Sequence, residues 1–525
     1  MKSIVFKSLT ALAIIALLFL SIYMARYSIK DAINNIFPPT DISSLNLSQE
    51  EKIEDFEYFY DTVVSSMTSI DNYEYLYGFN FKKRRDLYIK LILETKNDYE
   101  FYALMDAIVQ EIPSFHTELL DPYSYNKVYC YNCEAVRTDR DVIRHNKYWR
   151  NIVDIVKSED DSKYYSFLYN RGYYYFNTAE SSVDSKISNY KLEKINGISV
   201  DEYVTKLPSV FNLYYDGEKN KPCRTRIVFN DRKGKECKLT LSSDKGETIN
   251  YTLFTNIYLE RVFLEKINDM YDENDETSDF IAFEAPNISY VKIDDFDSKN
   301  GPKVENLLKN IKNDNVILDL RQNSGGNNKF AADNIYPYLF SKRIIEENTF
   351  YVPKSNANEC ITRNIFNVLN IHLKNSESNP FNKNIEMYQG KKINSYIGKI
   401  NKNKNVAILV SHYTGSAADN FIHDMRKNNL AYVIGNNTGG EGLNFSFVEL
   451  KLPNSNLAFV YTPGGSYTFD NYDNSVYGTR PDFYLDTTES FIDYLYNNRP
   501  KGFDDLYNND ETIRYAYEYL INNYT

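Results

Sequence analysis

One serine stands among small residues at the apparent junction of a strand and a helix, in the segment SHYTGSAADNF, residues 411–421. The preceding NVAILV is typical of a buried strand, and the following AADNFIHDMRKNN has the apolar spacing of a helix. Two interpretations of Ser416 are open. It could cap the helix, or its hydroxyl could be a nucleophile if a neighbouring base removes its proton.

A second loop whose residues could take part in catalysis follows another apolar run. Its sequence is LDLRQNSGGNN, residues 318–328. Gly325 and Gly326 permit backbone conformations that expose N–H groups. Such groups, placed just before a helix, can bind an oxyanion. The alternative is a tight turn that needs glycine only for its shape.

The elements that must position these loops form three regions after the N-terminal segment. Residues 31–124 have helical spacing, beginning with a capping-box pattern at Ser48 and Glu51. Residues 125–258 contain short strands and turns, and their segment KLEKINGISVDEY resembles a turn of PDZ domains. In residues 259–525, strands and helices alternate from about residue 278, which predicts a layered α/β core.

The N-terminal segment, residues 1–30, has lysines at positions 2 and 7 and then an apolar run of about 17 residues. This layout is typical of a signal peptide or signal anchor. An uncleaved anchor is the favoured interpretation, with the bulk of the chain outside the cytoplasm. The net charge of −12 argues against a nucleic-acid partner, because no long basic stripe is present to neutralise phosphates.

Five cysteines leave three states open. Cys130 and Cys133 form a CxxC pair, and Cys223 and Cys237 form a wider pair downstream. The two pairs could ligate zinc, form a disulfide in an oxidising compartment or remain inert buried thiols. Cys360 has no partner in this pattern. The second spacing is too wide for a zinc knuckle, so we expect no metal.

Taken together, the two loops resemble the carboxy-terminal processing and tricorn-type serine peptidases of the tail-specific protease superfamily. In that family a strand ends in DLRxNxGG, and a later strand leads into a loop of the type SASE, a helix and VIGxxTxG. Here ILDLRQNSGG matches the first motif, and ILVSHYTGSAADNFIHDMRKNNLAYVIGNNTGG matches the second in order and spacing. The resemblance covers residues 278–485 and implies a crotonase/Clp-like layered α/β core, an N-terminal helical region and an inserted PDZ-like β-rich module.

The resemblance makes Ser416 the nucleophile. It implies an oxyanion hole built from the backbone N–H of Ala417 and of a glycine in the pair Gly325-Gly326. The processing-peptidase branch uses a lysine twenty-five residues after the serine as its base, but Glu441 occupies that position here. This departure excludes a direct transfer of a serine–lysine dyad.

The tricorn-type branch takes its base from a histidine in the N-terminal part, and PSFHTELL supplies His116 there. An unperturbed histidine pKa suits a general base near neutral pH. His412 and His423, which are closer to Ser416 in the sequence, are the alternative bases.

A third group should orient the histidine. Asp470, Asp473 and Glu441 are the candidates, and the sequence does not choose among them. Asp419, just past the nucleophile, is the acidic position of the family motif, and its alternative role is to compensate charge at a helix N-terminus.

These observations predict a membrane-anchored, extracytoplasmic serine endopeptidase that cleaves polypeptides through an acyl-enzyme and needs no cofactor. A protein of another class is the competing interpretation. It would be a catalytically inactive peptide-binding or scaffold protein that has kept the same fold.

Overall fold

The computed structural model describes most of the chain outside its N-terminal segment. The described residues are 30, 33–70, 80–112, 114, 116–123, 138–158, 163–177, 187, 190–206, 213–231, 235–243, 245–255, 280–359, 374–375, 385–443, 448–487 and 500–524. Within these ranges, no helix combines the length and the apolar character that a bilayer crossing demands. The predicted anchor at residues 1–30 lies outside them except for its last residue, and so do the predicted boundaries at residues 124 and 258.

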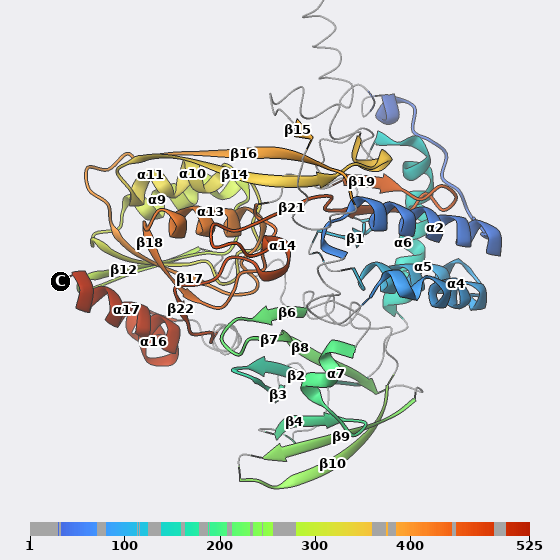
Figure 1. The fold of residues 1–525 in the computed structure, drawn as a ribbon, viewed down its shortest axis with the longest axis horizontal. Helices are drawn as coiled ribbons and strands as arrows, with labels where there is room; N and C mark the ends of the chain where they lie inside the picture. The colour runs from blue at the N-terminus through green and yellow to red at the C-terminus, as the bar shows by residue number, and fades with distance from the viewer. Residues whose placement is uncertain are drawn as a thin grey trace, which may run out of the picture.

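A six-stranded sheet forms the centre of the C-terminal half, in the order β11-β12-β13-β17-β18-β22 (Figure 1). Strand β11 is antiparallel to β12, and the remaining neighbours are parallel. The strands are β11 (Phe280–Ala285), β12 (Ile288–Ile293), β13 (Asn315–Asp319), β17 (Asn405–Val410), β18 (Ala431–Gly435) and β22 (Phe483–Tyr484). The predicted α/β core is therefore confirmed.

Helices cover both faces of this sheet, which explains the unbroken apolar runs of its strands. In β17, Val406, Ile408 and Val410 pack on one side, whereas Ala407 and Leu409 pack on the other. The first face is covered by α9 (Gly301–Lys309), α10 (Phe330–Asn334), α11 (Tyr336–Leu339) and α13 (Ser416–Lys427). The second is covered by α16 (Phe503–Asn509) and α17 (Glu511–Tyr524).

The DLR residues of the first motif stabilise the core. The guanidinium of Arg321 lies 2.7 Å from a carboxylate oxygen of Asp319 and 2.7 Å from one of Asp510, and all three side chains are buried. Asp510 directly precedes α17, so this network ties the C-terminal helix to the end of β13. Removing one member of such a buried network costs about 3–5 kcal/mol, because a charge is left without its partner.

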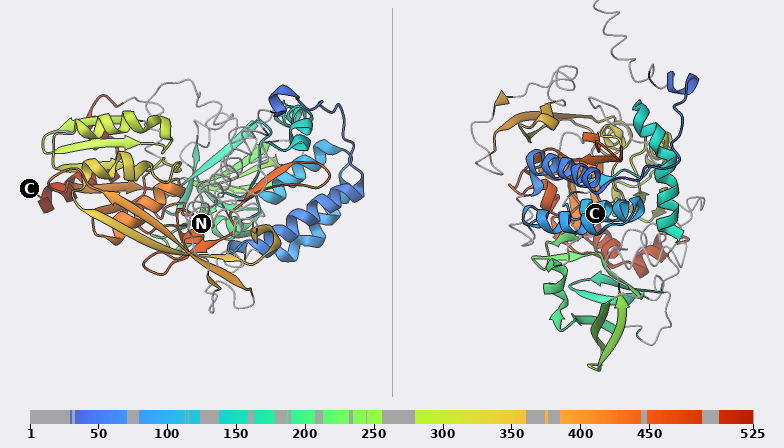
Figure 2. Two further views of the ribbon diagram at one scale, coloured as in Figure 1. Left: turned by 90° about the horizontal axis from the view of Figure 1, so that it is seen from above. Right: turned by 90° about the vertical axis from the view of Figure 1, so that its right-hand side faces the viewer.

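A long antiparallel hairpin links the core to the N-terminal helices. It consists of β14 (Arg343–Pro353) and β16 (Met387–Ile397), flanked by β15 (Lys374–Asn375) and β21 (Gly465–Ser466). Figure 2 shows the hairpin running from the core helices to the N-terminal region. One face of it packs inward, and the side chains on that face include Asn348, Phe350, Lys392, Asn394 and Tyr396.

The N-terminal helices pack on a small sheet that belongs partly to the core. They are α2 (Gln49–Ser66), α4 (Arg85–Glu94), α5 (Asp98–Val109) and α6 (Arg140–Ser158). The predicted capping box at Ser48 and Glu51 begins α2. The small sheet has the order β1-β20-β19, with β1 (Glu118–Leu119), β20 (Ala458–Tyr461) and β19 (Val448–Lys451). The short strand β1 thus fixes the end of the helical region to the core.

A β-rich module lies below these two parts in Figure 1. Its main sheet has the order β10-β9-β4-β3-β2-β8, with β5 paired to β4. The module consists of β2 (Lys163–Asn170), β3 (Tyr173–Asn177), β4 (Tyr190–Ile195), β5 (Ile198–Ser199), α7 (Val200–Lys206), β6 (Leu213–Asp216), β7 (Lys221–Arg224), β8 (Arg226–Asp231), β9 (Lys235–Ser243) and β10 (Thr248–Thr255). Asn196 and Gly197, both with positive φ, form the turn between β4 and β5.

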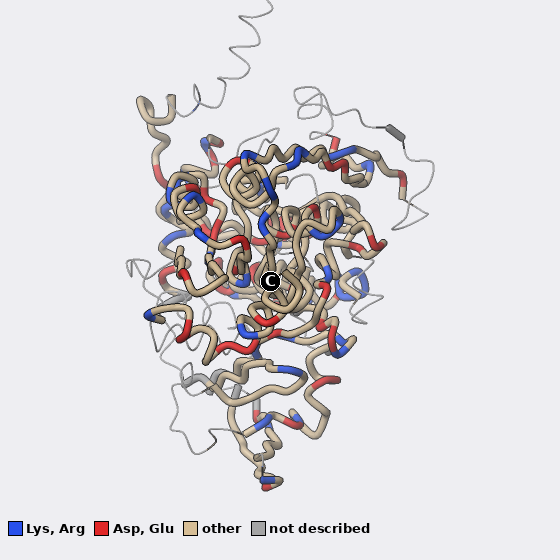
Figure 3. Tube along the Cα trace, turned by 90° about the vertical axis from the view of Figure 1, so that its left-hand side faces the viewer, with Lys and Arg blue, Asp and Glu red and all other residues tan. Residues whose placement is uncertain are grey.

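The module and the core share one short helix, α14 (Asn474–Tyr477). Val476 belongs to the hydrophobic cluster of the module, whereas the neighbouring Asn474 bonds to the core. Figure 3 shows basic and acidic residues interspersed along the chain.

Candidate functional site

Ser416 is the first residue of α13 and has a φ of 49°, in the left-handed region that few residues other than glycine adopt. The N-cap position is Gly415, so Ser416 is not the cap of its helix. Its N–H donates to Gly440 O at 2.8 Å, which holds the strained residue in place. Residues in such conformations cost about 1–3 kcal/mol and cluster at functional sites.

The glycine loop lies directly against this serine. Gly415 N donates to Asn323 O at 3.0 Å, which joins the two loops. Gly325 has a φ of 109°, and a Cβ on it would stand 2.7 Å from Ser416 Cβ and 2.9 Å from Ala417 N. The structure therefore brings together the two loops that the sequence singles out, and only glycine fits at position 325.

The backbone donors around Ser416 are not equivalent. The N–H of Gly325 already donates to Asn323 Oδ1 at 2.9 Å. Among the described residues, no acceptor faces the N–H of Gly326 or that of Ala417. Ala417 lies in the first turn of α13, where the helix dipole favours negative charge. Of the three predicted oxyanion donors, Gly325 N is therefore the one already engaged in a hydrogen bond.

His116 and Glu441 form an ion pair, with 2.6 Å between His116 Nδ1 and Glu441 Oε2. The Glu441 side chain is only 1% exposed, whereas that of His116 is 29% exposed. Burial lowers the pKa of His116, but the Glu441 carboxylate outweighs it and the net pKa is raised. For Glu441 the signs are opposite. Burial raises the pKa of its carboxyl group, but the pairing with His116 outweighs burial, and the net pKa is lowered. Thr462 Oγ1 donates to the same carboxylate at 3.2 Å.

Glu441 is held beside the backbone of Ser416 by both of its neighbours. Gly440 O accepts from Ser416 N, and a Cβ on Gly442 would stand 2.3 Å from Ser416 O. The acid that fills the position of the family's lysine is therefore part of the same site. Because His116 is bonded to Glu441, it lies at this end of α13 as well.

Asp419, one turn into α13, organises the loop that carries Glu441. Its buried carboxylate accepts hydrogen bonds from Thr438 Oγ1, Gly442 N, Asn474 Nδ2 and Thr479 N. Two of these donors flank Glu441 in the sequence, and a third belongs to α14. The role that the structure gives Asp419 is thus wider than charge compensation at a helix end.

The two aspartates offered as orienting acids have other partners. Asp470 accepts from Arg426 Nη1 at 3.2 Å and from Thr468 Oγ1 at 2.6 Å. Asp473 is the N-cap of α14 and accepts from Ser475 N at 3.0 Å. Glu441, which is paired with His116, is therefore the acid that the geometry favours.

The alternative histidines also lie elsewhere. His423 Nε2 accepts from Phe469 N at 3.0 Å, and its Nδ1 lies 3.2 Å from Asp424 Oδ1. The His412 ring stacks on Tyr214 of the module, with 4.4 Å between ring centroids, and burial lowers its pKa to about 4.

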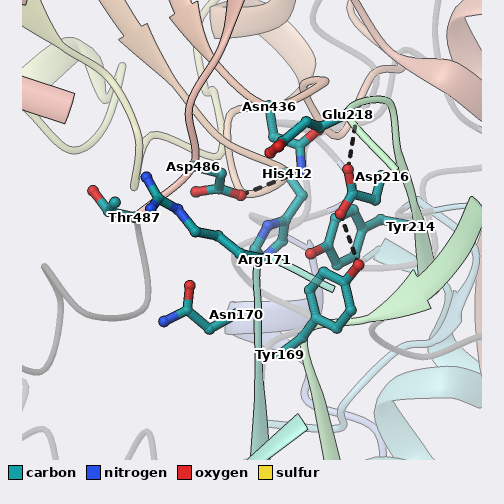
Figure 4. A pocket seen from close by; sticks show the side chains of 10 residues that line it. All are labelled: Tyr169, Asn170, Arg171, Tyr214, Asp216, Glu218, His412, Asn436, Asp486 and Thr487. Atoms are coloured by element: carbon teal, nitrogen blue, oxygen red, sulfur yellow. Dashed lines mark hydrogen bonds between the residues drawn. The ribbon is translucent and has the colours of Figure 1, made fainter. Parts of the chain in front are cut away.

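His412 faces a small pocket at the joint between module and core (Figure 4). The lining residues are Tyr169, Asn170, Arg171, Tyr214, Asp216, Glu218, His412, Asn436, Asp486 and Thr487. Both histidines are thus used in packing and hydrogen bonding away from the His116–Glu441 pair.

The two described cysteines belong to the hydrophobic cluster of the β-rich module. Cys223 and Cys237 are free, buried thiols, so the second predicted pair is not a disulfide. Cys130, Cys133 and Cys360 lie outside the described residues. In the described ranges, no three His, Cys, Asp or Glu side chains are grouped so as to hold a metal.

One neighbour of the site is absent from the sequence-based prediction. Lys392, on the inner face of β16, donates from Nζ to Gly442 O at 2.6 Å. It stands in the segment YQGKKINSYI, where polar and apolar residues alternate as on any half-exposed strand. Nothing in that pattern distinguishes it from its neighbour Lys391.

One protein family and several solved structures resemble this chain. The family model described as Peptidase family S41 matches residues 287–485. No curated protein sequence matches this chain. The solved structure of mature CPAF is similar, with 10% identity, a TM-score of 0.51, and coverage of 91% of this chain and 99% of that one.

Two further solved structures are similar to this chain. Mature CPAF complexed with lactacystin has 10% identity and a TM-score of 0.50, with coverage of 90% of this chain and 99% of that one. A photosystem II D1 C-terminal processing protease has 13% identity and a TM-score of 0.34, with coverage of 83% and 93%. With the α/β core and the serine and glycine loops in place, the family match identifies residues 287–485 as a peptidase family S41 domain and supports a serine peptidase.

Proposed function

We propose that this protein is a serine endopeptidase that cleaves polypeptides through an acyl-enzyme, with Ser416, His116 and Glu441 as its catalytic triad. The observation that carries the proposal is the His116–Glu441 pair, held against the strained first residue of α13. A serine hydroxyl is a weak nucleophile until a positioned base accepts its proton.

In the first half of the reaction, His116 Nε2 accepts the proton of Ser416 Oγ while the oxygen attacks the peptide carbonyl carbon. Glu441 holds the ring through Nδ1 and stabilises the imidazolium that forms. The N–H groups of Gly326 and Ala417 would bind the oxyanion. His116 then gives the proton to the leaving amine, and the peptide C–N bond breaks.

In the second half, water attacks the acyl carbon with His116 again as base. The proton returns to Ser416 as the acid product leaves. No step calls for a metal or an organic cofactor.

The β-rich module is proposed to act as a PDZ-like binding module. Its Asn196-Gly197 turn and neighbouring strands match the sequence resemblance. A free strand edge could take up an extended peptide, and a nest of N–H groups could take its C-terminal carboxylate. The apolar N-terminal run supports a membrane-anchored, extracytoplasmic enzyme, which protease protection of membrane vesicles would test.

A fluorophosphonate probe tests the catalytic proposal directly. We expect the wild type to be labelled and to cleave casein or tail peptides, and Ser416→Ala to do neither. His116→Gln should lose labelling, whereas His423→Gln should keep it. Unlabelled wild type that leaves every peptide intact would instead favour the inactive peptide-binding protein.

A further inference from the structure

The ammonium group of Lys392 touches the turn that carries the proposed orienting acid. Its Nζ donates to the carbonyl oxygen of Gly442, the residue after Glu441. Gly442 N is bonded to Asp419, and its Cα lies against Ser416 O. Lys392 therefore braces from β16 the same turn that Asp419 holds from α13.

A cation is not needed for this hydrogen bond alone. Two residues along on the same face, the neutral amide of Asn394 bonds to Asn420 Oδ1 at 3.1 Å and to Asp424 Oδ2 at 2.7 Å. Burying an ammonium group is costly by comparison. Burial lowers the pKa of Lys392 to about 8, although Asp424 and Asp419 act to raise it. The charge itself therefore calls for an explanation.

The charged groups around His116 supply one. Glu441 and Glu118 both favour the protonated imidazolium, and Lys392 is the cation that opposes them. A general base works only while it is neutral, because the protonated ring has no lone pair at Nε2. The carboxylates outweigh the cation, because the net pKa of His116 is raised, and without Lys392 this pKa would be raised further.

We propose that Lys392 is a positioning residue of this site, which anchors the Glu441–Gly442 turn and whose positive charge limits the preference of His116 for the protonated form. The proposal rests on the proposed function, in which His116 is the base. In this proposal Lys392 acts in two ways. Its N–H group donates a hydrogen bond, and its positive charge acts on His116.

The test uses the full chain with three substitutions of Lys392 and one control. Lys392→Gln keeps a donor and removes the charge, Lys392→Met removes both, and Lys392→Arg keeps both. Lys391→Met removes a neighbouring charge on the outer face, where Lys391 pairs with Glu347. For each protein, kcat/KM for a fluorogenic peptide is measured between pH 5 and 10.

The acidic limb of kcat/KM reports the pKa of the base in the free enzyme. We expect it to move upward by about 0.5–1 pH unit in Lys392→Gln and Lys392→Met, since removing a nearby cation favours imidazolium. The limb should stay in place in Lys392→Arg and Lys391→Met. At pH 9 the loss in Lys392→Gln should shrink, because His116 is neutral there in every variant.

A second readout does not need activity. Selective ¹³C labelling of the five histidines, with the His116 signal assigned from His116→Gln, gives the His116 titration by NMR in a Ser416→Ala background. The same upward shift is expected there. An unchanged limb and titration in folded Lys392→Gln and Lys392→Met would overturn the proposal. A wild type that neither labels nor cleaves would overturn the proposed function, and the titration would still judge the effect of the charge.

Discussion

Glu441 Oε2 lies 2.6 Å from His116 Nδ1, although one residue belongs to the glycine-rich loop after β18 and the other follows the N-terminal helices. The carboxylate is buried and the imidazole is partly open to solvent. A buried acid beside a partly exposed imidazole is an arrangement that suits proton transfer.

Glu441→Gln should keep the shape of the turn while removing its charge. We expect kcat to fall by about 10²–10⁴-fold, because the amide neither stabilises the imidazolium nor fixes its tautomer. Since the carboxylate raises the pKa of His116, the acidic limb of kcat/KM should move to lower pH. Thr462→Val, which removes a neutral donor to the same carboxylate, should cost less than tenfold. Equal effects of the two substitutions would contradict this ranking.

The His116–Glu441 pair should also give stability a defined pH window. The raised pKa of His116 gives stability below its unfolded pKa of about 6.5, which is lost as pH rises through the folded pKa. The lowered pKa of Glu441 gives stability above its unfolded pKa of about 4.3, which is lost as pH falls through the folded value. The wild type should therefore exceed His116→Gln in Tm by about 1–3 °C at pH 5.5 and by less at pH 9. A difference that grows with pH would oppose this prediction.

Gly325→Ala should damage the site by collision as well as by backbone strain. Its Cβ would press on Ser416 Cβ and Ala417 N, so we expect labelling by a fluorophosphonate to slow at least tenfold. Gly246→Ala is the matched control, because Gly246 also has a positive φ, of 81°, but nothing lies within 4 Å of its added Cβ. The control should lower Tm slightly and leave labelling intact. If both variants label alike, the contact with Ser416 is unimportant.

Asp419→Ala should loosen the loop that carries Glu441. The substitution removes the acceptor of the buried donors Gly442 N and Asn474 Nδ2, which costs about 1–3 kcal/mol for each group. We expect Tm to fall by several degrees and activity to fall with it. Asp470→Ala removes a more exposed carboxylate and should cost about 1 kcal/mol or less. Thermal melts of the two variants with the wild type provide the check.

The core and the loop of Ser416 could be predicted from the sequence, because short continuous segments determine both. The apolar composition of segments such as NVAILV predicts buried strands, and the serine and glycine loops follow those strands directly. Parallel strands end at one edge of a sheet, so loops about ninety residues apart meet there without further information.

The choice of acid could not be made in the same way. Asp470, Asp473 and Glu441 all carry a carboxyl group, and only the fold decides that Asp470 meets Arg426 while Glu441 meets His116. One signal was available, since Glu441 stands between Gly440 and Gly442, as a residue in a tight functional turn would. No sequence pattern singles out Lys392, because its contact with Gly442 depends on how the β14–β16 hairpin packs on α13.

Strand β1 has two residues, and its partner β20 is made roughly 340 residues later. A ribosome that adds about 5–20 residues per second needs on the order of 20–70 s to cover that distance. Throughout this interval the growing chain already carries His116, but the strand that fixes the neighbouring β1 to the core does not yet exist. The segment that holds His116 can therefore take its place beside Glu441 only after β20 has been made.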